Sequence, residues 1–264
     1  MSTDYHLHTP LCHHAVGWPI DYARLAASRG LTEIGFSEHS PFPEPFDDWR
    51  MALDDMPRYL ASLDEARAAV PDLTIRLGLE CDYIAGREPW LRELSTLAPW
   101  DYLIGSVHYI APGWDVDNPK YISRFREMPV EEIWEMYWRE YEKCIRSGLF
   151  DFVAHPDLPK KFGFRPAGDL RRYYEPAIRA LAETGIAYEI NTAGLRKDCR
   201  ELYPAPEFVR MACEAGVPVL INSDSHDPAE LGAGFAEALA CARAAGYRET
   251  VRFEKRRRTV VPLE

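Results

Sequence analysis

Asp4-Tyr5-His6-Leu7-His8, near the start of the chain, carries two histidines two residues apart on a short apolar segment. We expect the first β-strand over 2–6. Side chains at positions i and i+2 of a strand point to the same face, so both imidazoles can reach one metal ion. A single His-x-His pair often arises by chance, and its meaning depends on where the other histidines fall.

The chain has eight histidines, and none of them falls in a predicted helix. Each lies at or just after the end of a predicted strand: His6, His8, His13, His14, His39, His108, His155 and His226. A lone histidine after a strand is more often a hydrogen-bonded packing residue than a ligand. Placement of the whole set at strand ends is improbable by chance, and it indicates a metal-binding mouth.

The composition is that of an ordinary globular chain, with 264 residues, 47% hydrophobic and 28% charged. Barrels of α/β type commonly form one unit at this size, and we predict a single domain over 1–264. The six cysteines are scattered without a Cys-x-x-Cys pair, which argues against a zinc knuckle or a disulfide framework. The sequence has no signal-peptide pattern and no apolar run of about 18 residues. We therefore expect a cytoplasmic protein with no membrane partner.

The formal net charge is -11 at pH 7. Nucleic-acid binding usually needs a basic face, so we expect no nucleic-acid partner. The basic run Lys255-Arg256-Arg257-Arg258 is more typical of a solvated surface strand. An anionic substrate would need a local basic patch elsewhere. The sequence leaves the oligomeric state open.

Short apolar runs alternate with amphipathic stretches along the whole chain. Strands are predicted at 2–6, 33–37, 74–80, 101–107, 150–154, 186–191 and 217–222. Helices are predicted at 20–29, 56–69, 88–97, 129–147, 169–184, 205–215 and 228–245. Such alternation with short links implies parallel strands joined by right-handed crossovers. We predict an α/β fold, a TIM-like (β/α)7 barrel with a short hairpin over 250–261, and a doubly wound open sheet as the alternative.

Two connections, 40–55 and 109–128, are longer and less regular than the others. The first is rich in proline and aromatic residues, and the second contains Pro112-Gly113-Trp114. Long loops in compact domains are usually lids or binding loops. Because both follow strands that end near a histidine, we expect both to overhang the same mouth.

Carboxylates accompany the histidines at the predicted strand ends. Glu80 ends the third predicted strand, and Asp224 follows the last one. Active-site residues of barrels come from the carboxyl ends of the strands. Imidazole and carboxylate are ligands for Zn, Fe and Mn, and this set is too large for one ion. We expect two or three divalent metal ions, with a carboxylate bridging between them.

Two positions leave alternatives open. His13 and His14 compete for one place, because adjacent side chains rarely point to one centre. Asp4 either supports a ligand histidine through a hydrogen bond or is a turn residue at the start of the strand.

The order of these motifs resembles the PHP (polymerase and histidinol phosphatase) superfamily. The motifs are Asp4-x-His-x-His8, Glu38-His39, Glu80, Gly105-Ser-Val-His108, His155-x-Asp157 and Ser223-Asp-Ser-His226. Within it, the chain most resembles the monofunctional histidinol-phosphate phosphatases. That closer match is carried by His8-Thr-Pro-Leu-Cys-His-His14, His155-Pro-Asp-Leu-Pro-Lys-Lys-Phe-Gly163 and Asn191-Thr-Ala-Gly-Leu-Arg196. The resemblance implies a distorted (β/α)7 barrel with up to three metal ions.

The resemblance also implies how the ligands are shared. The first metal would be held by His6, His8, Glu80 and Asp224, and the second by Glu80, His108 and His155. The third would be held by His14, His39 and His226; His14 is preferred to His13 because it lies six residues after His8. Ser37-Glu38-His39 and Ser225 depart from the usual family motifs Thr-Asp-His and Ser-Asp-Ala-His. Neither departure changes a ligand.

The resemblance implies hydrolysis of a phosphomonoester, and the mechanism then follows from the ions. A hydroxide held between two metals is available near neutral pH and would attack phosphorus in line. Glu80 and Asp224 would hold the ions, and no nucleophile elbow or Cys-x5-Arg signature indicates a protein nucleophile. The leaving alkoxide would be protonated by a metal-bound water, by His226 or by Asp157, and the sequence does not choose among them.

The expected substrate is L-histidinol phosphate, cleaved to L-histidinol and phosphate in histidine biosynthesis. Lys160, Lys161, Arg196 and, as a weaker candidate, Arg50 are predicted to bind the phosphate. Acidic and aromatic residues of the two long loops are candidates for the imidazole and ammonium groups: Glu44, Asp47, Trp114, Asp115 and Asp117. The alternatives are a PHP phosphatase for phosphotyrosine or nucleic-acid ends, or a metal-binding barrel without catalysis.

Overall fold

The computed structural model describes residues 3–263, and its centre is a curled sheet of six parallel strands in the order β1-β2-β3-β6-β7-β8. The strands are β1 (Glu33–His39), β2 (Thr74–Asp82), β3 (Tyr102–Ser106), β6 (Phe152–Val153), β7 (Ala187–Asn191) and β8 (Val219–Asn222). All pairings within this sheet are parallel. Strand order follows chain order around the curl, which is the arrangement of a barrel and not of a doubly wound open sheet.

The N-terminal segment closes the curl between β1 and β8. Its backbone makes parallel bridges from Asp4 to Ile34 and from Leu7 to Ser225. The amide of Gly35 donates to the carbonyl of Asp4 at 2.8 Å, and the amide of His8 donates to the carbonyl of Ser225 at 3.0 Å. The predicted distorted barrel is therefore confirmed.

The strand predicted over 2–6 is present only as isolated bridges, and position 2 lies outside the described residues. Side chains replace part of the ladder here. The amide of Tyr5 donates to the side-chain oxygen of Asn222 at 2.8 Å, and the Asp4 carboxylate accepts from the amide of Ser223 at 3.0 Å. These hydrogen bonds hold the N-terminal segment in place without a continuous β-ladder, and the barrel is distorted there for this reason.

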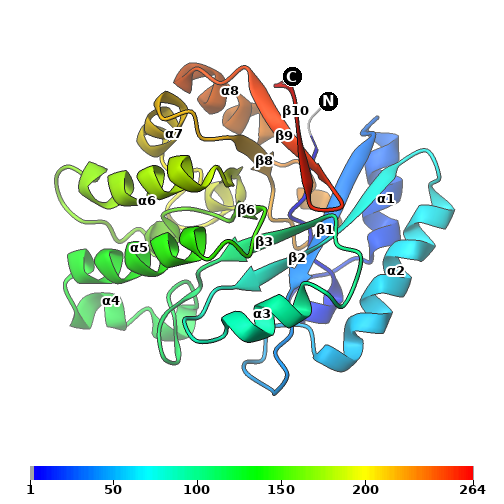
Figure 1. The fold of residues 1–264 in the computed structure, drawn as a ribbon, viewed down its shortest axis with the longest axis horizontal. Helices are drawn as coiled ribbons and strands as arrows, with labels where there is room; N and C mark the ends of the chain where they lie inside the picture. Colours follow the sequence, from blue (N-terminus) through cyan, green and yellow to red (C-terminus); the bar gives the residue numbers. More distant parts are fainter. Residues whose placement is uncertain (1–2, 264) are drawn as a thin grey trace.

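Helices lie on the outside of the curled sheet (Figure 1). They are α1 (Pro19–Ser28), α2 (Met56–Ala69), α3 (Glu88–Leu94), α5 (Val130–Arg146), α6 (Arg171–Thr184), α7 (Pro206–Glu214) and α8 (Phe235–Ala245). In α5 the buried residues recur every three or four positions, as expected for a helix that covers a core with one face: Ile133, Trp134, Tyr137, Trp138, Tyr141, Cys144 and Ile145. No helix within residues 3–263 has the length and apolar character needed to cross a membrane.

The last predicted helix is shorter than expected. The sequence predicts it over 228–245, but α8 begins only at Phe235, after a separate 3-10 turn at Pro228–Glu230. Gly232 and Gly234 between them adopt φ values of 66° and 78°, which break the helical path. The loop over 109–128 contains a small hairpin, β4 (Tyr109–Ala111) and β5 (Trp114–Asp115), and one helical turn, α4 (Arg124–Glu127).

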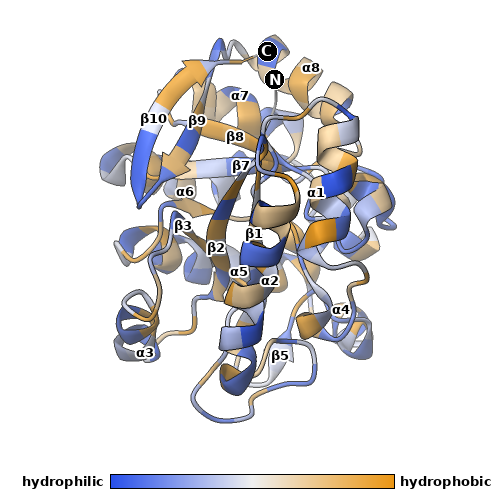
Figure 2. Cartoon of the chain, turned by 90° about the vertical axis from the view of Figure 1, so that its right-hand side faces the viewer, coloured by the Kyte–Doolittle hydropathy of each residue, from blue (hydrophilic) through white to orange (hydrophobic). Residues whose placement is uncertain are grey.

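The amino-terminal end of the barrel is filled by apolar side chains. One buried cluster contains Tyr5, Tyr102, Ile104, Phe152, Ala154, Ala187, Leu220, Val251 and Phe253. A methyl group on Gly78 would lie 2.3 Å from the Tyr102 ring, so only glycine leaves room for it. The predicted hairpin is formed by β9 (Glu249–Glu254) and β10 (Arg257–Pro262), whose Val251 and Phe253 cover this end. Figure 2 shows apolar colour along β8, whereas α1 on the outside carries both apolar and polar segments.

Candidate metal centre

The predicted ligands meet at the opposite, carboxyl-terminal end of the strands, around Glu80. Its Oε1 lies 2.9 Å from Nε2 of His155 and 3.6 Å from Nε2 of His108. Its Oε2 lies 2.8 Å from Nδ1 of His39 and 3.3 Å from Nε2 of His6. Glu80 is 1% exposed and near the end of β2, where one carboxylate faces imidazoles from four separate segments.

Asp224 contacts the same group from the other side. Its Oδ1 lies 3.4 Å from Nε2 of His8 and 3.5 Å from Nδ1 of His226. Its other oxygen accepts a hydrogen bond from the side-chain amide of Asn191 at 3.2 Å, which fixes its orientation. Asp224 adopts a φ of 51°, a left-handed conformation that directs the chain from β8 into the mouth.

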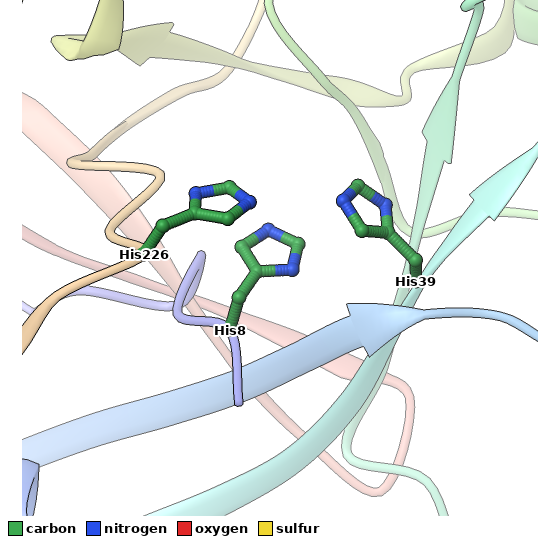
Figure 3. Close-up of side chains that lie close together, drawn as sticks. All are labelled: His8, His39 and His226. Carbon is green, nitrogen blue, oxygen red and sulfur yellow. The ribbon is translucent and has the colours of Figure 1, made fainter. Parts of the chain in front are cut away.

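Five groups of side chains in the described part of the chain bring ligand atoms within 4.8 Å of one another, and three of them consist entirely of metal ligands predicted from the sequence. These three are His6, His8 and Glu80; Glu80, His108 and His155; and His8, His39 and His226. The last group is shown in Figure 3, where rings from three distant segments point toward one space. The structure thus places His8 with His39 and His226, where the family resemblance implied His14.

His14 lies at the rim of the same site. Its ring stacks on that of His226 at 4.6 Å between centroids, and its Nδ1 is 2.7 Å from the carbonyl of Cys12. Cys12 was not predicted as a site residue, yet its thiol forms a further close group with His14 and His226. His13 and His14 are both exposed, and among the described residues only His14 belongs to one of these close groups.

Several buried polar atoms in this cluster have no hydrogen-bond partner and are available to bind cations. Buried side-chain atoms without a hydrogen-bond partner include Nε2 of His6, His8 and His226, Nδ1 of His39 and His155, and Oε2 of Glu80. Buried polar atoms are normally hydrogen-bonded, and each orphan carries a free-energy cost of about 1–3 kcal/mol. Lone pairs of six converging side chains are the donors that Zn, Fe or Mn require. The residues therefore fit a group of divalent metal ions.

The imidazoles divide into two electrostatic sets. Burial lowers the pKa of His39 to about 4 and holds the pKa of His226 well below its usual range. Burial also acts on His8, but the nearby carboxylates of Asp224 and Glu38 outweigh it and raise its pKa to about 9. Burial is likewise outweighed at His108, where Asp82 and Glu80 raise the pKa. Neutral imidazole binds metal directly, whereas the second set must exchange a proton for the ion.

Carboxylates contact the Nδ1 nitrogen of three candidate ligand histidines. The sequence analysis did not assign this role to them. Nδ1 of His6 lies 3.0 Å from Glu189, Nδ1 of His8 lies 3.4 Å from Glu38, and Nδ1 of His108 lies 2.8 Å from Asp82. Metal-ligating histidines usually donate the second ring nitrogen to such a group, which fixes the tautomer and leaves Nε2 for the ion. An available signal was the spacing of Glu80 and Asp82, two residues apart on one strand face.

A cavity of about 390 Å³ opens over the cluster. Its lining includes His14, His39, Glu80, His108, His155, Asp224 and His226, while His6 and His8 lie beneath it. Two lysines line it, Lys161 and Lys197, and so do the acidic Asp48, Asp115 and Asp117 with Trp49. Both long loops contribute to this lining, as the sequence predicted.

Lys160 and Asp157, unlike Lys161, are not in the cavity. The Lys160 ammonium is 1% exposed and contacts Asp157 at 3.0 Å and the carbonyl of Leu202 at 2.6 Å. Asp157 is fully buried and accepts from the amide of Ala205 at 2.9 Å. This pair ties the segment after β6 to the loop before α7, which corrects the predicted contact of Lys160 with phosphate and the predicted catalytic place of Asp157.

Arg196 and Arg50 are also held by the protein. Arg196 donates to the carbonyl of Ser223 at 2.8 Å and pairs with Glu230, so it braces the backbone that carries Asp224 and does not line the cavity. Arg50 belongs to the 40–55 loop, is 5% exposed and is not part of the cavity lining. Of the four predicted phosphate contacts, the structure brings only Lys161 to the cavity lining.

The fold and the site define a barrel metalloprotein whose ion-binding residues sit at the carboxyl ends of the strands and beneath a polar cavity. The PHP domain family model matches residues 4–193, and the chain belongs to the PHP family. A probable histidinol-phosphatase of Deinococcus radiodurans is 41% identical over 256 residues, covering 96% of this chain and 97% of that protein. A histidinol-phosphatase of Bacillus subtilis is 29% identical and covers 87% and 95% of the two chains.

Among solved structures, the fold is similar to histidinol phosphate phosphatase from Lactococcus lactis, which was crystallised with zinc, L-histidinol and phosphate. The TM-score is 0.81 over 98% of both chains, at 22% identity. At that identity the comparison supports the fold, and the site rests on the residues of this chain.

Proposed function

We propose that this protein is a metal-dependent histidinol-phosphatase, which hydrolyses L-histidinol phosphate to L-histidinol and phosphate. The observation that carries the proposal is the 41% identity over nearly the full length to a probable histidinol-phosphatase, in a chain whose predicted ligands all lie at one barrel mouth. A barrel that had lost catalysis would be expected to lose ligands, and this set is complete.

The ligand assignment is part of the proposal. Glu80 would be shared between ions, with His6, His8 and Asp224 on one side and His108 and His155 on the other. His39, His226 and either His8 or His14 would complete a third position. Bound ions would neutralise charge on the phosphoryl group and lower the pKa of water.

The cavity supplies charges of both signs for the substrate. Lys161 and Lys197 are placed to attract the phosphate. Asp48, Asp115 and Asp117 are suited to an ammonium group, and the Trp49 ring offers a face to an imidazole. Of the two side chains considered for protonating the leaving alkoxide, His226 lines the cavity and Asp157 does not, so we assign this role to His226.

The cytoplasmic location is also a proposal. Six free cysteines occur in the described part of the chain, three of them buried, and none pairs with another. Unpaired thiols in this number are typical of a reducing compartment.

Phosphate release tests the function directly. Purified protein would be given L-histidinol phosphate, a phosphotyrosine peptide or a 5′-phosphorylated oligonucleotide, before and after removal of metal by a chelator. We expect release from histidinol phosphate that chelation abolishes and added Zn²⁺, Mn²⁺ or Fe²⁺ restores. Preference for phosphotyrosine or oligonucleotide would overturn the substrate, and release that survives complete metal removal would overturn the metal dependence.

A further inference from the structure

Arg50 occupies a place that the proposed reaction does not explain. Its guanidinium is buried and uses all three nitrogens to contact three other residues. Nη2 lies 2.9 Å from Asp82 and 2.6 Å from Asp47, Nε lies 2.8 Å from Asp47, and Nη1 donates to the carbonyl of Ser40 at 3.0 Å. A planar fork with several donors can make these contacts together, and a lysine cannot.

Asp82 uses its two oxygens for different partners. Oδ2 accepts from Arg50, and Oδ1 lies 2.8 Å from Nδ1 of His108 and 3.4 Å from its backbone amide. Nε2 of the same ring lies 3.6 Å from Glu80. The ring of His108 is therefore held at one nitrogen by Asp82 and presents the other to the metal-binding group.

The same guanidinium is packed between aromatic rings of the 40–55 loop. Its carbon lies 4.6 Å from the ring centroids of Phe42 and Trp49. Trp49 meets His108 edge-on at 5.3 Å and His39 at 4.7 Å. Arg50 thus connects its own loop, which contributes to the cavity lining, with the carboxylate that orients His108.

We propose that Arg50 is a positioning residue for the metal ligand His108, acting through Asp82, and not a phosphate contact. Arg50 occupies Oδ2 of Asp82, so the carboxylate keeps Oδ1 toward His108. Without the guanidinium, Asp82 is a buried carboxylate free to turn, and the ring of His108 loses its fixed orientation. The inference rests on the proposed metal centre, but it does not depend on which phosphate ester is the substrate.

Arg50→Met compared with Arg87→Met tests the role. Arg87 lies over the same Phe42 and Phe46 rings, at 5.2 and 5.7 Å, and pairs with Glu44, but it has no contact with Asp82. Zn²⁺ affinity would be measured by competition with a chromogenic chelator, and ligand geometry by the visible spectrum of the Co²⁺-loaded protein. We expect Arg50→Met to weaken one bound ion by about tenfold or more and to change the Co²⁺ spectrum, with Arg87→Met unchanged.

Kinetics separate this role from direct phosphate binding. At saturating metal, Arg50→Met should lower kcat while the inhibition constant of inorganic phosphate stays within about twofold of wild type. A raised phosphate inhibition constant with unchanged metal affinity would overturn the proposal in favour of a phosphate contact. Equal metal affinity in both variants and wild type would reduce Arg50 to a structural residue.

Two further variants keep the test decisive if Arg50→Met does not fold. Arg50→Lys keeps the charge but not the fork, and the same weakening of one ion is expected. Asp82→Asn should weaken the same ion, and the double variant should lose no more than the larger single effect, because the two residues act in series. Additive losses would contradict the proposal. Metal affinity is read without substrate, so failure of the histidinol phosphate assignment would leave this result standing.

Discussion

The two ends of the barrel are built by the same strands but have opposite chemistry. At the amino-terminal end, Tyr102 and Phe152 pack with Phe253 of the closing hairpin in a dry cluster. At the carboxyl-terminal end, Glu80 and His39 face other titratable groups, and one polar atom of each lacks a hydrogen-bond partner. Because the strands are parallel, residues a few positions apart along one strand lie toward opposite ends of the barrel. One end contributes to stability and the other to function.

The largest expected effect is at the centre of the mouth. Glu80→Gln removes the charge shared by the surrounding imidazoles, and we expect kcat to fall by at least about 1000-fold with a loss of bound metal. Phosphate release and elemental analysis measure both. Glu33→Gln is the control at the other end of the barrel: Glu33 accepts from Tyr5 and Arg76, so its loss should lower stability without changing metal content.

Metal loading should be coupled to protons at the mouth. The pKa of His8 is raised to about 9, and those of His6 and His108 are raised as well, so we expect these rings to hold protons near pH 7 in the metal-free protein. Zn²⁺ binding must displace these protons, and apparent affinity should rise with pH by about tenfold per unit for each proton released. A pH-stat titration measures the release, and His8→Ala should release fewer protons. Affinity that is flat between pH 7 and 8 would contradict the assignment.

Substitutions at the amino-terminal end of the barrel should change stability and leave metal binding unchanged. Phe253→Ala removes a ring that is 2% exposed and stacks on Phe152, and we expect a loss of about 3–5 kcal/mol in the free energy of unfolding. Urea denaturation measures it, and metal content should not change. Val260→Ala on the neighbouring strand, 58% exposed, is the control and should cost less than about 0.5 kcal/mol. Loss of metal in Phe253→Ala would show that the two ends are coupled.

A substitution of Glu189 tests whether this residue supports the metal-binding end of the barrel or its structural end. It is fully buried in β7, accepts from the amide of His155 at 3.0 Å and from the side chain of Asn222 at 2.7 Å, and contacts His6. Glu189→Gln turns an amide toward these donors, so we expect metal affinity to fall by about 10–100-fold. Glu183→Gln, on the exposed end of α6, is the control. Unchanged affinity in Glu189→Gln would place Glu189 with the structural end.

The smallest expected effect separates two adjacent lysines. Lys161 lines the cavity and pairs with Asp117 at 2.7 Å, so Lys161→Met should raise KM for the phosphate ester by about tenfold with little change in stability. Lys160→Met should leave KM unchanged and lower the free energy of unfolding, since Asp157 would be left buried and unpaired. Steady-state kinetics and denaturation curves distinguish the two, and a raised KM for Lys160→Met would reverse the assignment.

Most of the architecture could be predicted from local patterns in the sequence. Alternating apolar runs located all six strands of the sheet and its flanking helices, because burial on both faces of a parallel strand leaves a visible signature. The position of histidines at strand ends indicated the mouth, since parallel strands bring their carboxyl ends to one edge. The sequence predicted that α8 begins earlier than it does, because the two glycines with positive φ before Phe235 do not interrupt the hydrophobic periodicity.

Tertiary structure decided which charged side chain faces which partner. Lys160 and Lys161 are neighbours in the chain, yet a single 3-10 turn sends one to Asp157 and the other to the cavity. Arg50 looks like a phosphate contact in the sequence and is instead committed to Asp82, 32 residues away. Candidate ligands can be predicted from residue type and strand position, which are local. Orientation depends on long-range ion pairs and burial, and these exist only once the barrel has closed.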